Sequence, residues 1–187
     1  MNAKYDILIV GVGGQGTLLA SRVLGKYALD MGFDVKLSEV HGMAQRGGSV
    51  MTYVRIGKNI ASPIIDEGGA DLILSFEKLE ALRYRHYLKE GGHILYSTQE
   101  IMPMPVVTGA AEYPKGIEQE LPGTGVDALA LAIEAGNSKS ANSVMLGALC
   151  KKLGFDREKF EAALISCIPQ KTIDMNKKAF ALGYAAA

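Results

Sequence analysis

The chain has 187 residues, a formal net charge of zero at pH 7 and 21% charged residues. A neutral chain of this length predicts one domain with a substantial core, and its charge gives no reason to expect binding to nucleic acid or to an acidic membrane. It contains no apolar run near the roughly 18 residues that a membrane-spanning helix needs. The two cysteines, Cys150 and Cys167, are isolated, so we interpret both as small buried hydrophobes in a protein of the reducing cytoplasm.

The first forty residues predict a βαβ unit. Residues 5–10 (YDILIV) form a nearly continuous apolar run, which is typical of a strand covered on both faces in a parallel sheet. After a glycine-rich turn, apolar side chains recur at helical spacing over residues 19–31. Gly32 ends this helix, and residues 34–40 are the second strand.

The middle of the chain alternates strands with one helix. Residues 49–56 (SVMTYVRI) and 71–76 (DLILSF) predict the third and fourth strands. Residues 77–89 predict a helix, and residues 93–97 predict the fifth strand. Residues 101–123 contain four of the six prolines, so we expect irregular segments or short edge strands there.

From residue 124 onward the pattern is helical. The predicted helices span about 127–135, 142–153, 157–167 and 171–184. We therefore predict an α/β fold, with a Rossmann-like, doubly wound and mostly parallel sheet and a helical C-terminal part. Residues 1–187 are expected to be a single domain, with an α/β core at 1–123 and C-terminal helices at 124–187.

The first candidate site is the glycine-rich turn GVGGQG, which follows a strand and precedes a helix. Gly11, Gly13 and Gly16 have the GxGxxG spacing of dinucleotide-binding turns, and Gly14 lies between them. Such a turn brings the backbone N–H groups at a helix start close to a phosphate or a carboxylate. Close packing of the helix on the sheet would require the same glycines, so both interpretations stay open.

Two further residues bear on which nucleotide-binding motif the turn resembles. Glu39 ends the second strand, 23 residues after Gly16, where an acidic side chain is able to bind a ribose hydroxyl. Thr17 stands where a P-loop requires lysine, so the turn is not a P-loop.

The second candidate site is the stretch SEVHGMAQRGGSV, which joins two predicted strands. Arg46 is its one strong cation, and the planar guanidinium suits a phosphate or a carboxylate. The stretch is interpreted as holding a ligand or a neighbouring protein, and an ion pair from Arg46 to Glu39 that only shapes the loop is the other interpretation. Its candidate residues either bend the backbone or form hydrogen bonds: Glu39, His41, Gly42, Gln45, Arg46, Gly47, Gly48 and Ser49.

Other polar residues are assigned structural roles. Glu77 and Glu80 lie three apart at the start of the predicted helix, and we expect them to cap and solvate it. Asn142 precedes a helical run and is predicted to be a cap as well.

Four segments together carry a resemblance: GVGGQGTLLASRVLG, SEVHGMAQRGGSV, DLILSFEKLEALR and NSVMLGALCKKLG. Over nearly its whole length the chain resembles the gamma domain of the pyruvate:ferredoxin oxidoreductase family, with most similarity to the small (beta) subunits of indolepyruvate ferredoxin oxidoreductases. The HGMAQRGGSV block, which contains residues 42–49, is much more specific than any GxGxxG.

The resemblance implies a non-catalytic subunit of a 2-oxoacid:ferredoxin oxidoreductase, inactive alone. In this family a 2-oxoacid, here indolepyruvate or another aryl pyruvate, is oxidatively decarboxylated to acyl-coenzyme A, and ferredoxin accepts the electrons. It implies no cofactor on this chain. Thiamine diphosphate, magnesium and [4Fe–4S] clusters are expected on a catalytic alpha subunit, with coenzyme A as co-substrate and ferredoxin reached through the complex.

A free-standing NAD- or FAD-binding oxidoreductase is the alternative that the glycine turn leaves open. Such an enzyme binds its cofactor as a single chain and needs a catalytic base. His41 is the one candidate base, and Glu39 is its one obvious partner.

Overall fold

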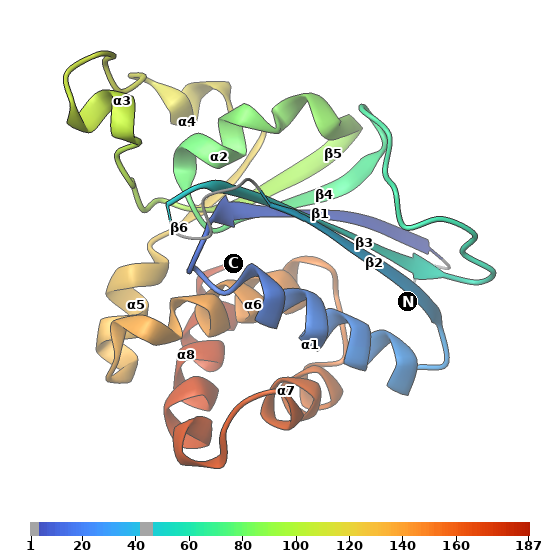
Figure 1. The fold of residues 1–187 in the computed structure, drawn as a ribbon. Coiled ribbons are helices and arrows are strands. Elements are labelled where there is room, and N and C mark those ends of the chain that lie inside the picture. Colours follow the sequence, from blue (N-terminus) through green and yellow to red (C-terminus); the bar gives the residue numbers. More distant parts are fainter. Residues whose placement is uncertain (1–3, 42–46) are drawn as a thin grey trace.

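The computed structural model describes residues 4–41 and 47–187, with the side chain of His41 excepted. A six-stranded sheet lies between two layers of helices (Figure 1). The strands are β1 (Lys4–Val12), β2 (Asp34–His41), β3 (Ser49–Gly57), β4 (Ala70–Ser75), β5 (Leu88–Ser97) and β6 (Gly123–Val126). Their order is β2-β3-β1-β4-β5-β6.

Parallel pairing dominates this sheet. β1, β4, β5 and β6 pair in parallel in that order, whereas β3 pairs antiparallel with both β1 and β2. Five of the six strands therefore point the same way, and the predicted α/β fold with a mostly parallel sheet is confirmed.

Helices cover both faces of the sheet. Helices α1 and α5 to α8 lie on one face, and α2, α3 and α4 lie on the other side (Figure 1). The α-helices are α1 (Thr17–Asp30), α2 (Lys78–Arg83), α3 (Met104–Val107), α4 (Ile117–Glu120), α5 (Ala128–Ala135), α6 (Ala141–Lys152), α7 (Arg157–Ser166) and α8 (Ile173–Ala186). Short 3-10 helices are η1 (Arg85–Tyr87), η2 (Ser138–Ser140) and η3 (Gln170–Thr172). No helix in the described part of the chain combines the length and the apolar character that crossing a membrane requires.

Successive side chains of β1 enter two different cores. Ile7 and Ile9 pack in the core beneath α1 and the C-terminal helices, while Leu8 and Val10 pack in the core beneath α2. All four side chains are fully buried. This two-sided burial explains the continuous apolar run of β1, because a strand covered on both faces has no polar side.

The predicted βαβ unit forms, but β2 does not lie next to β1. β3 turns back from β2, pairs with it from Asp34↔Gly57 to His41↔Val50, and pairs through its other edge with the whole of β1. β3 takes the interior position because its apolar residues suit burial on both faces.

The helix predicted at 77–89 is wrong in length. α2 ends at Arg83, and β5 begins at Leu88 rather than at residue 93. Leu88 pairs with Ala70, and regular pairing resumes at His93↔Leu72 after a bulge. The early pairing of Leu88 is a tertiary contact that helical periodicity does not reveal.

The C-terminal helices agree with their predicted positions to within about two residues. Residues 101–122 are irregular, as one of the two alternatives predicted, apart from two short helices, α3 and α4, and the edge strand β6 begins at Gly123. The boundary predicted between residues 123 and 124 falls inside β6, so the sheet extends into the C-terminal part.

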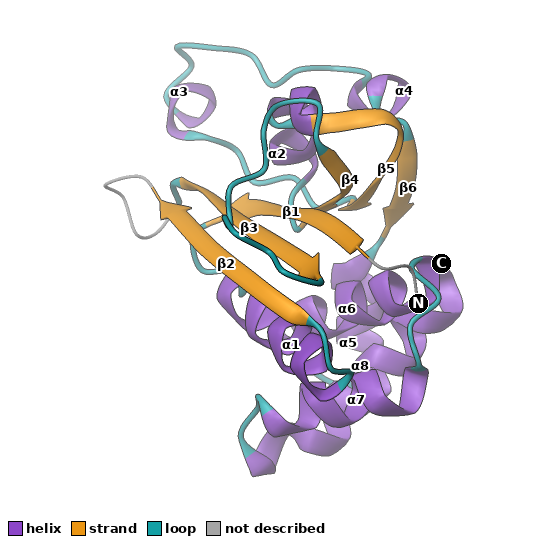
Figure 2. Ribbon diagram, turned by 90° about the vertical axis from the view of Figure 1, so that its right-hand side faces the viewer, coloured by secondary structure: helices purple, strands orange, loops and turns teal. Residues whose placement is uncertain are grey.

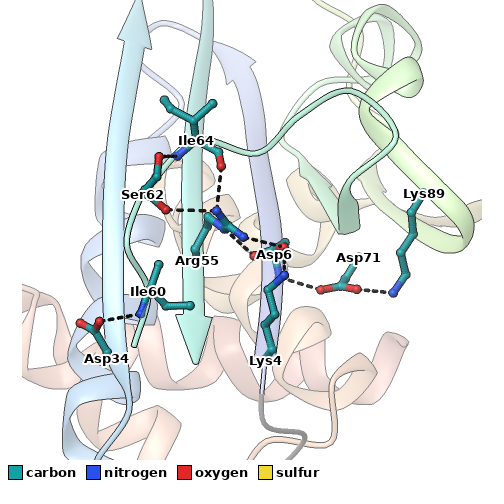
Figure 3. A network of polar contacts seen from close by, with 9 residues as sticks. All are labelled: Lys4, Asp6, Asp34, Arg55, Ile60, Ser62, Ile64, Asp71 and Lys89. Atoms are coloured by element: carbon teal, nitrogen blue, oxygen red, sulfur yellow. Dashed lines mark hydrogen bonds and ion pairs between the residues drawn. The ribbon is translucent and has the colours of Figure 1, made fainter. Parts of the chain in front are cut away.

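A polar network braces the amino ends of β1 and β4 (Figure 3). Arg55 Nε donates a hydrogen bond to the Asp6 carboxylate at 2.8 Å. The backbone N–H of Asp6 donates to Asp71 Oδ2 at 2.7 Å. Arg55 also donates to the carbonyl oxygens of Ser62 and Ile64, which fastens the loop that crosses this face of the sheet (Figure 2). Burial alone would raise the pKa of Asp6, but its hydrogen bonds and charge interactions with Arg55 and Lys4 outweigh it and lower the pKa.

Candidate functional site

The two candidate stretches meet at the carboxyl end of β1. β1 and β3 pair up to Val12↔Ser49. Beyond this pair, the N–H of Gly13 donates to the carbonyl oxygen of Gly48 at 2.8 Å, and the N–H of Gly47 donates to that of Gly13 at 3.5 Å. The glycine turn and the end of the second stretch therefore form one continuous backbone surface.

The side chain of Gln15 fastens the glycine turn from within. Its Oε1 accepts from the N–H of Val12 at 2.8 Å. Its Nε2 donates to the carbonyl oxygen of Phe76 at 2.8 Å and to Gln99 Oε1 at 3.3 Å. Gln15 thus links the ends of β1, β4 and β5, which makes the turn rigid. Sequence reasoning missed this residue, although a polar side chain inside a glycine turn was the available signal.

Packing accounts for two of the four turn glycines. A Cβ on Gly11 would lie 3.0 Å from Gln15 Oε1, and a Cβ on Gly16 would lie 2.5 Å from Asn142 Nδ2. Gly16 also has a φ of 88°. Gly14 differs, because its φ of 103° requires glycine while a Cβ at this position would meet no atom within 4 Å. Gly14 therefore faces open space.

That open space belongs to a cavity of about 430 Å³ at the carboxyl ends of β1, β4 and β5. On one side of β1 lie β3 and β2, and on the other side lies β4, so the order of the sheet reverses here. Ligands of open α/β sheets bind at such a reversal. The cavity is lined by Gly14, Gln15, Gly16, Phe76, Ser97, Gln99, Ala128, Leu129, Ser138, Lys139, Ala141, Asn142 and Met145.

Glu39 does not line this cavity. It is exposed on β2, which β3 separates from β1. Two strand spacings place it about 10 Å from β1 across the sheet. In a dinucleotide-binding fold, by contrast, the strand with the ribose-binding acid is the direct neighbour of β1.

Part of the second stretch lies outside the described residues. This applies to Gly42, Gln45 and Arg46, and to the side chain of His41, whose backbone ends β2. The predicted roles of these residues stay predictions.

Ser49 anchors the described end of the second stretch to α2. Its Oγ donates to Glu80 Oε2 and lies 3.0 Å from the hydroxyl of Tyr84. Glu80 also accepts from Arg83 Nε at 3.0 Å. The base of the stretch is therefore fixed to a helix that packs on the sheet.

Glu77 caps α2, as predicted, but the expected solvation of Glu77 and Glu80 is wrong. Glu77 is 1% exposed and Glu80 is 5% exposed. The Glu77 carboxylate accepts from the N–H of Glu80 at 2.8 Å, from the N–H of Ile101 at 3.1 Å and from the hydroxyl of Tyr113 at 3.2 Å. Burial raises the pKa of Glu77 despite these three bonds. The carboxylate therefore ties the 101–113 segment to the start of α2.

Asn142 is not the cap that was predicted. It is the second residue of α6, and its Oδ1 accepts from the N–H of Ser143 at 2.8 Å. Its amide nitrogen faces Gly16 across the cavity wall. Asn142, Lys139, Gln99 and Ser97 were missed as site residues because the fold alone brings their segments together.

The described residues bring together no group of three or more His, Cys, Asp or Glu side chains suited to a metal ion. Cys150 is fully buried, as predicted, and burial raises the pKa of its thiol to about 12. Cys167 is only partly buried.

Comparison with known proteins identifies the family. Residues 6–186 match the family described as pyruvate ferredoxin/flavodoxin oxidoreductase. The chain belongs to this family. The resemblance predicted from the four sequence segments is thereby confirmed.

Within the oxidoreductase family, the chain is 45% identical to the indolepyruvate oxidoreductase subunit IorB of Thermococcus kodakarensis, over 98% of this chain and 96% of that protein. Among solved structures, it is similar to the gamma subunit of a keto/oxoacid ferredoxin oxidoreductase from Geobacter sulfurreducens. The TM-score is 0.75 and the identity 28%, with 98% of each chain covered.

The same fold also occurs inside a longer chain. A 2-oxoglutarate:ferredoxin oxidoreductase from Magnetococcus marinus, solved with 2-oxoglutarate, coenzyme A and succinyl-CoA bound, matches with a TM-score of 0.77 and 19% identity. The match covers 100% of this chain and 31% of that one. Both a separate small subunit and part of a large one can therefore have this architecture.

Proposed function

We propose that the chain is the small, non-catalytic subunit of an indolepyruvate, or other aryl pyruvate, ferredoxin oxidoreductase. The observation that carries the proposal is the 45% identity to an indolepyruvate oxidoreductase subunit over 98% of the chain. The complete enzyme would oxidatively decarboxylate the 2-oxoacid to acyl-coenzyme A and pass the electrons to ferredoxin. Its place of action is the cytoplasm.

The proposed partner is a catalytic alpha subunit that carries thiamine diphosphate, magnesium and [4Fe–4S] clusters. A [4Fe–4S] cluster is held by four cysteine thiolates, whereas this chain has two cysteines. One of these, Cys150, lies in the core beneath the C-terminal helices. The donor set of this chain therefore does not fit a cluster, which supports placing the electron-transfer groups on the partner.

Coenzyme A is the proposed co-substrate. The related fold in the Magnetococcus marinus enzyme belongs to a complex solved with coenzyme A and succinyl-CoA. On this chain, the glycine turn offers backbone N–H groups that suit an anionic ligand.

We further propose that the backbone surface formed by Gly13, Gly47 and Gly48 faces the catalytic subunit, together with Glu39 and the intervening residues. Three sets of hydrogen bonds hold this surface in place and support the role. They join Gly13 to Gly47 and Gly48, Gln15 to Val12, and Ser49 to Glu80. A surface held in one shape before contact loses less conformational entropy on association. The contribution of these residues to the reaction is to position the partner or its ligand.

Affinity capture of the tagged chain from cells that produce it tests the assembly. A larger, cysteine-rich chain with bound iron and acid-labile sulfide is expected to co-purify in a fixed ratio. Capture of the chain alone, in cells that oxidise indolepyruvate with ferredoxin, would contradict the proposal.

The alternative of a free-standing NAD- or FAD-binding oxidoreductase finds no support in the site. The β3 strand separates Glu39 from the glycine turn, and Gln15 occupies the interior of that turn. Titration with NAD or FAD is expected to give no tight, stoichiometric binding to the single chain.

A further inference from the structure

The cavity at the sheet reversal has a lining of one charge sign. Its lining includes Lys139 and contains neither aspartate nor glutamate. Lys139 forms no ion pair with any residue that the structure describes. A concave wall with an unneutralised cation favours an anionic occupant.

Two amide side chains of the cavity, those of Gln99 and Asn142, have spare donors. Gln99 Oε1 is used by Gln15 and Asn142 Oδ1 by the N–H of Ser143, which also fixes the orientation of both amides. The amide nitrogens of Gln99 and Asn142 donate to no described residue. An occupant that accepts hydrogen bonds would satisfy them.

Ser97 adds a deeply buried donor to the same wall. It is 2% exposed, and its Oγ accepts from the N–H of Gln99 at 3.3 Å. Its hydroxyl proton has no acceptor among the residues with described positions. A buried hydroxyl that lacks an acceptor is costly, so a ligand oxygen in the cavity would relieve this cost.

Three helices begin at the cavity, and the Asp127 carboxylate already caps one of them, α5. They are α1, which follows Gly16, α5, which begins at Ala128, and α6, which begins at Ala141. The positive ends of the α1 and α6 dipoles, which have no side-chain cap and no acidic residue in the first turn, reinforce the charge of Lys139.

Most of the remaining wall, Ser138 excepted, is apolar. Phe76, Leu129 and Met145 contribute large hydrophobic side chains, and the volume of about 430 Å³ lies in the range of small-molecule sites. An inorganic anion would leave this wall without contacts. The site therefore suits a molecule that combines an anionic head with an apolar body.

We propose that this cavity binds a small organic anion, in which a carboxylate or a phosphate ester is attached to an apolar group. Lys139, Ser97 and the amide nitrogens of Gln99 and Asn142 hold the anionic head. Leu129, which is half-buried, contacts the apolar body. The site lies entirely within this chain, so its occupancy does not depend on the catalytic subunit or on the reaction proposed above.

Nuclear magnetic resonance titration of the full-length, ¹⁵N-labelled chain tests the site. The probes are phenylacetate for the carboxylate, phenyl phosphate for the phosphate ester, and 2-phenylethanol as a neutral compound with a similar body. At least one of the two anions is expected to bind with a dissociation constant of about 1 mM or lower, and about tenfold more tightly than the alcohol. The amide shifts of Gly14, Gly16 and Leu129 should respond. The anion that binds more tightly identifies the head group.

Substitution of Lys139 supplies the second arm. Lys139 is exposed at the rim, so Lys139→Met and Lys139→Glu should leave the spectrum of the free chain otherwise intact. Lys139→Met should weaken anion binding about three- to tenfold, and Lys139→Glu should weaken it further. Lys58→Met, which removes an exposed lysine from the loop between β3 and β4, is the matched control and should bind normally.

Three results would overturn the proposal. They are equal binding of the alcohol and both anions, shifts confined to residues away from the cavity, and anion binding that neither substitution of Lys139 changes. The titration uses the unmodified chain, so it tests the proposal even if a substituted chain misfolds. Because it also needs no partner subunit, failure here leaves the proposed assembly standing, and failure of the assembly leaves this site standing.

Discussion

Replacement of Gly147 by alanine should destabilise the chain through the crossing of α6 and α8. A Cβ on Gly147 would lie 2.0 Å from the carbonyl oxygen of Phe180, and a Cβ on Gly183 would lie 1.9 Å from that of Val144. These neighbours are backbone atoms, which cannot rotate away. Because α6 begins at the cavity, this close crossing also positions Asn142 and Met145.

The expected magnitude follows from two opposing effects. Restoring an ordinary contact of 3.4 Å to the Phe180 oxygen requires about 1.4 Å of separation, the difference between 3.4 and 2.0 Å. Overpacking of a core costs about 1–3 kcal/mol, and the backbone contact places this site at the upper end. Alanine in place of glycine returns about 1 kcal/mol of helix propensity. The net loss of about 2 kcal/mol corresponds to a fall in melting temperature of about 4–8 °C for a domain of this size.

Gly25→Ala in α1 is the matched control. A Cβ there would meet Leu37 Cδ1 at 3.4 Å, which is an ordinary contact. It should therefore gain about 0.5–1 kcal/mol and melt about 1–4 °C higher. Thermal denaturation followed by circular dichroism measures both variants. If Gly147→Ala melted as high as Gly25→Ala, the close crossing of α6 and α8 would be refuted.

Substitutions at three further positions test the polar network, the buried carboxylate and the predicted interface. Asp6→Asn should lower the free energy of unfolding by about 1–3 kcal/mol at pH 7. This deficit should shrink as the pH falls through the lowered pKa of Asp6, because the stabilising charge is lost in acid. A deficit that does not vary between pH 7 and pH 3 in urea unfolding would contradict this. Glu77 has a raised pKa, so the free energy of unfolding of the wild type should rise relative to that of Glu77→Gln as the pH falls toward that pKa. This pH dependence is opposite to that of Asp6. A relative loss of stability at lower pH would contradict the raised pKa of Glu77. The sequence predicts that Arg46 contacts the partner or its ligand. Arg46→Ala should therefore change the free energy of unfolding by about 0–1 kcal/mol but weaken binding to the catalytic subunit by about 2–5 kcal/mol. Arg46→Lys should rescue that binding poorly; a large loss of melting temperature with normal assembly would instead make Arg46 a partner of Glu39 that only shapes the loop.

Elements set by local pattern were predictable. The apolar run of β1, the β-rich composition of β3 and the 3.6-residue period of the C-terminal helices reflect burial that each segment experiences over its own length. The glycine turn was also recognisable, since Gly14 and Gly16 adopt positive φ values that favour glycine.

Long-range pairing and the composition of the cavity were not predictable. The insertion of β3 between β1 and β2 depends on edge pairing that no local period encodes. The early start of β5 depends on the pairing of Leu88 with Ala70. The cavity joins residues that lie between positions 14 and 145, and each of them has an ordinary structural role in its own segment.

The most direct test of the central claim is reconstitution of the reaction from separate chains. The rate of ferredoxin reduction is measured with indolepyruvate and coenzyme A, using the purified catalytic subunit with increasing amounts of this chain. We expect no turnover by this chain alone and a rate that rises with added chain until the complex is saturated. A catalytic subunit that reaches its full rate without the chain, and is unaffected by its addition, would contradict the account.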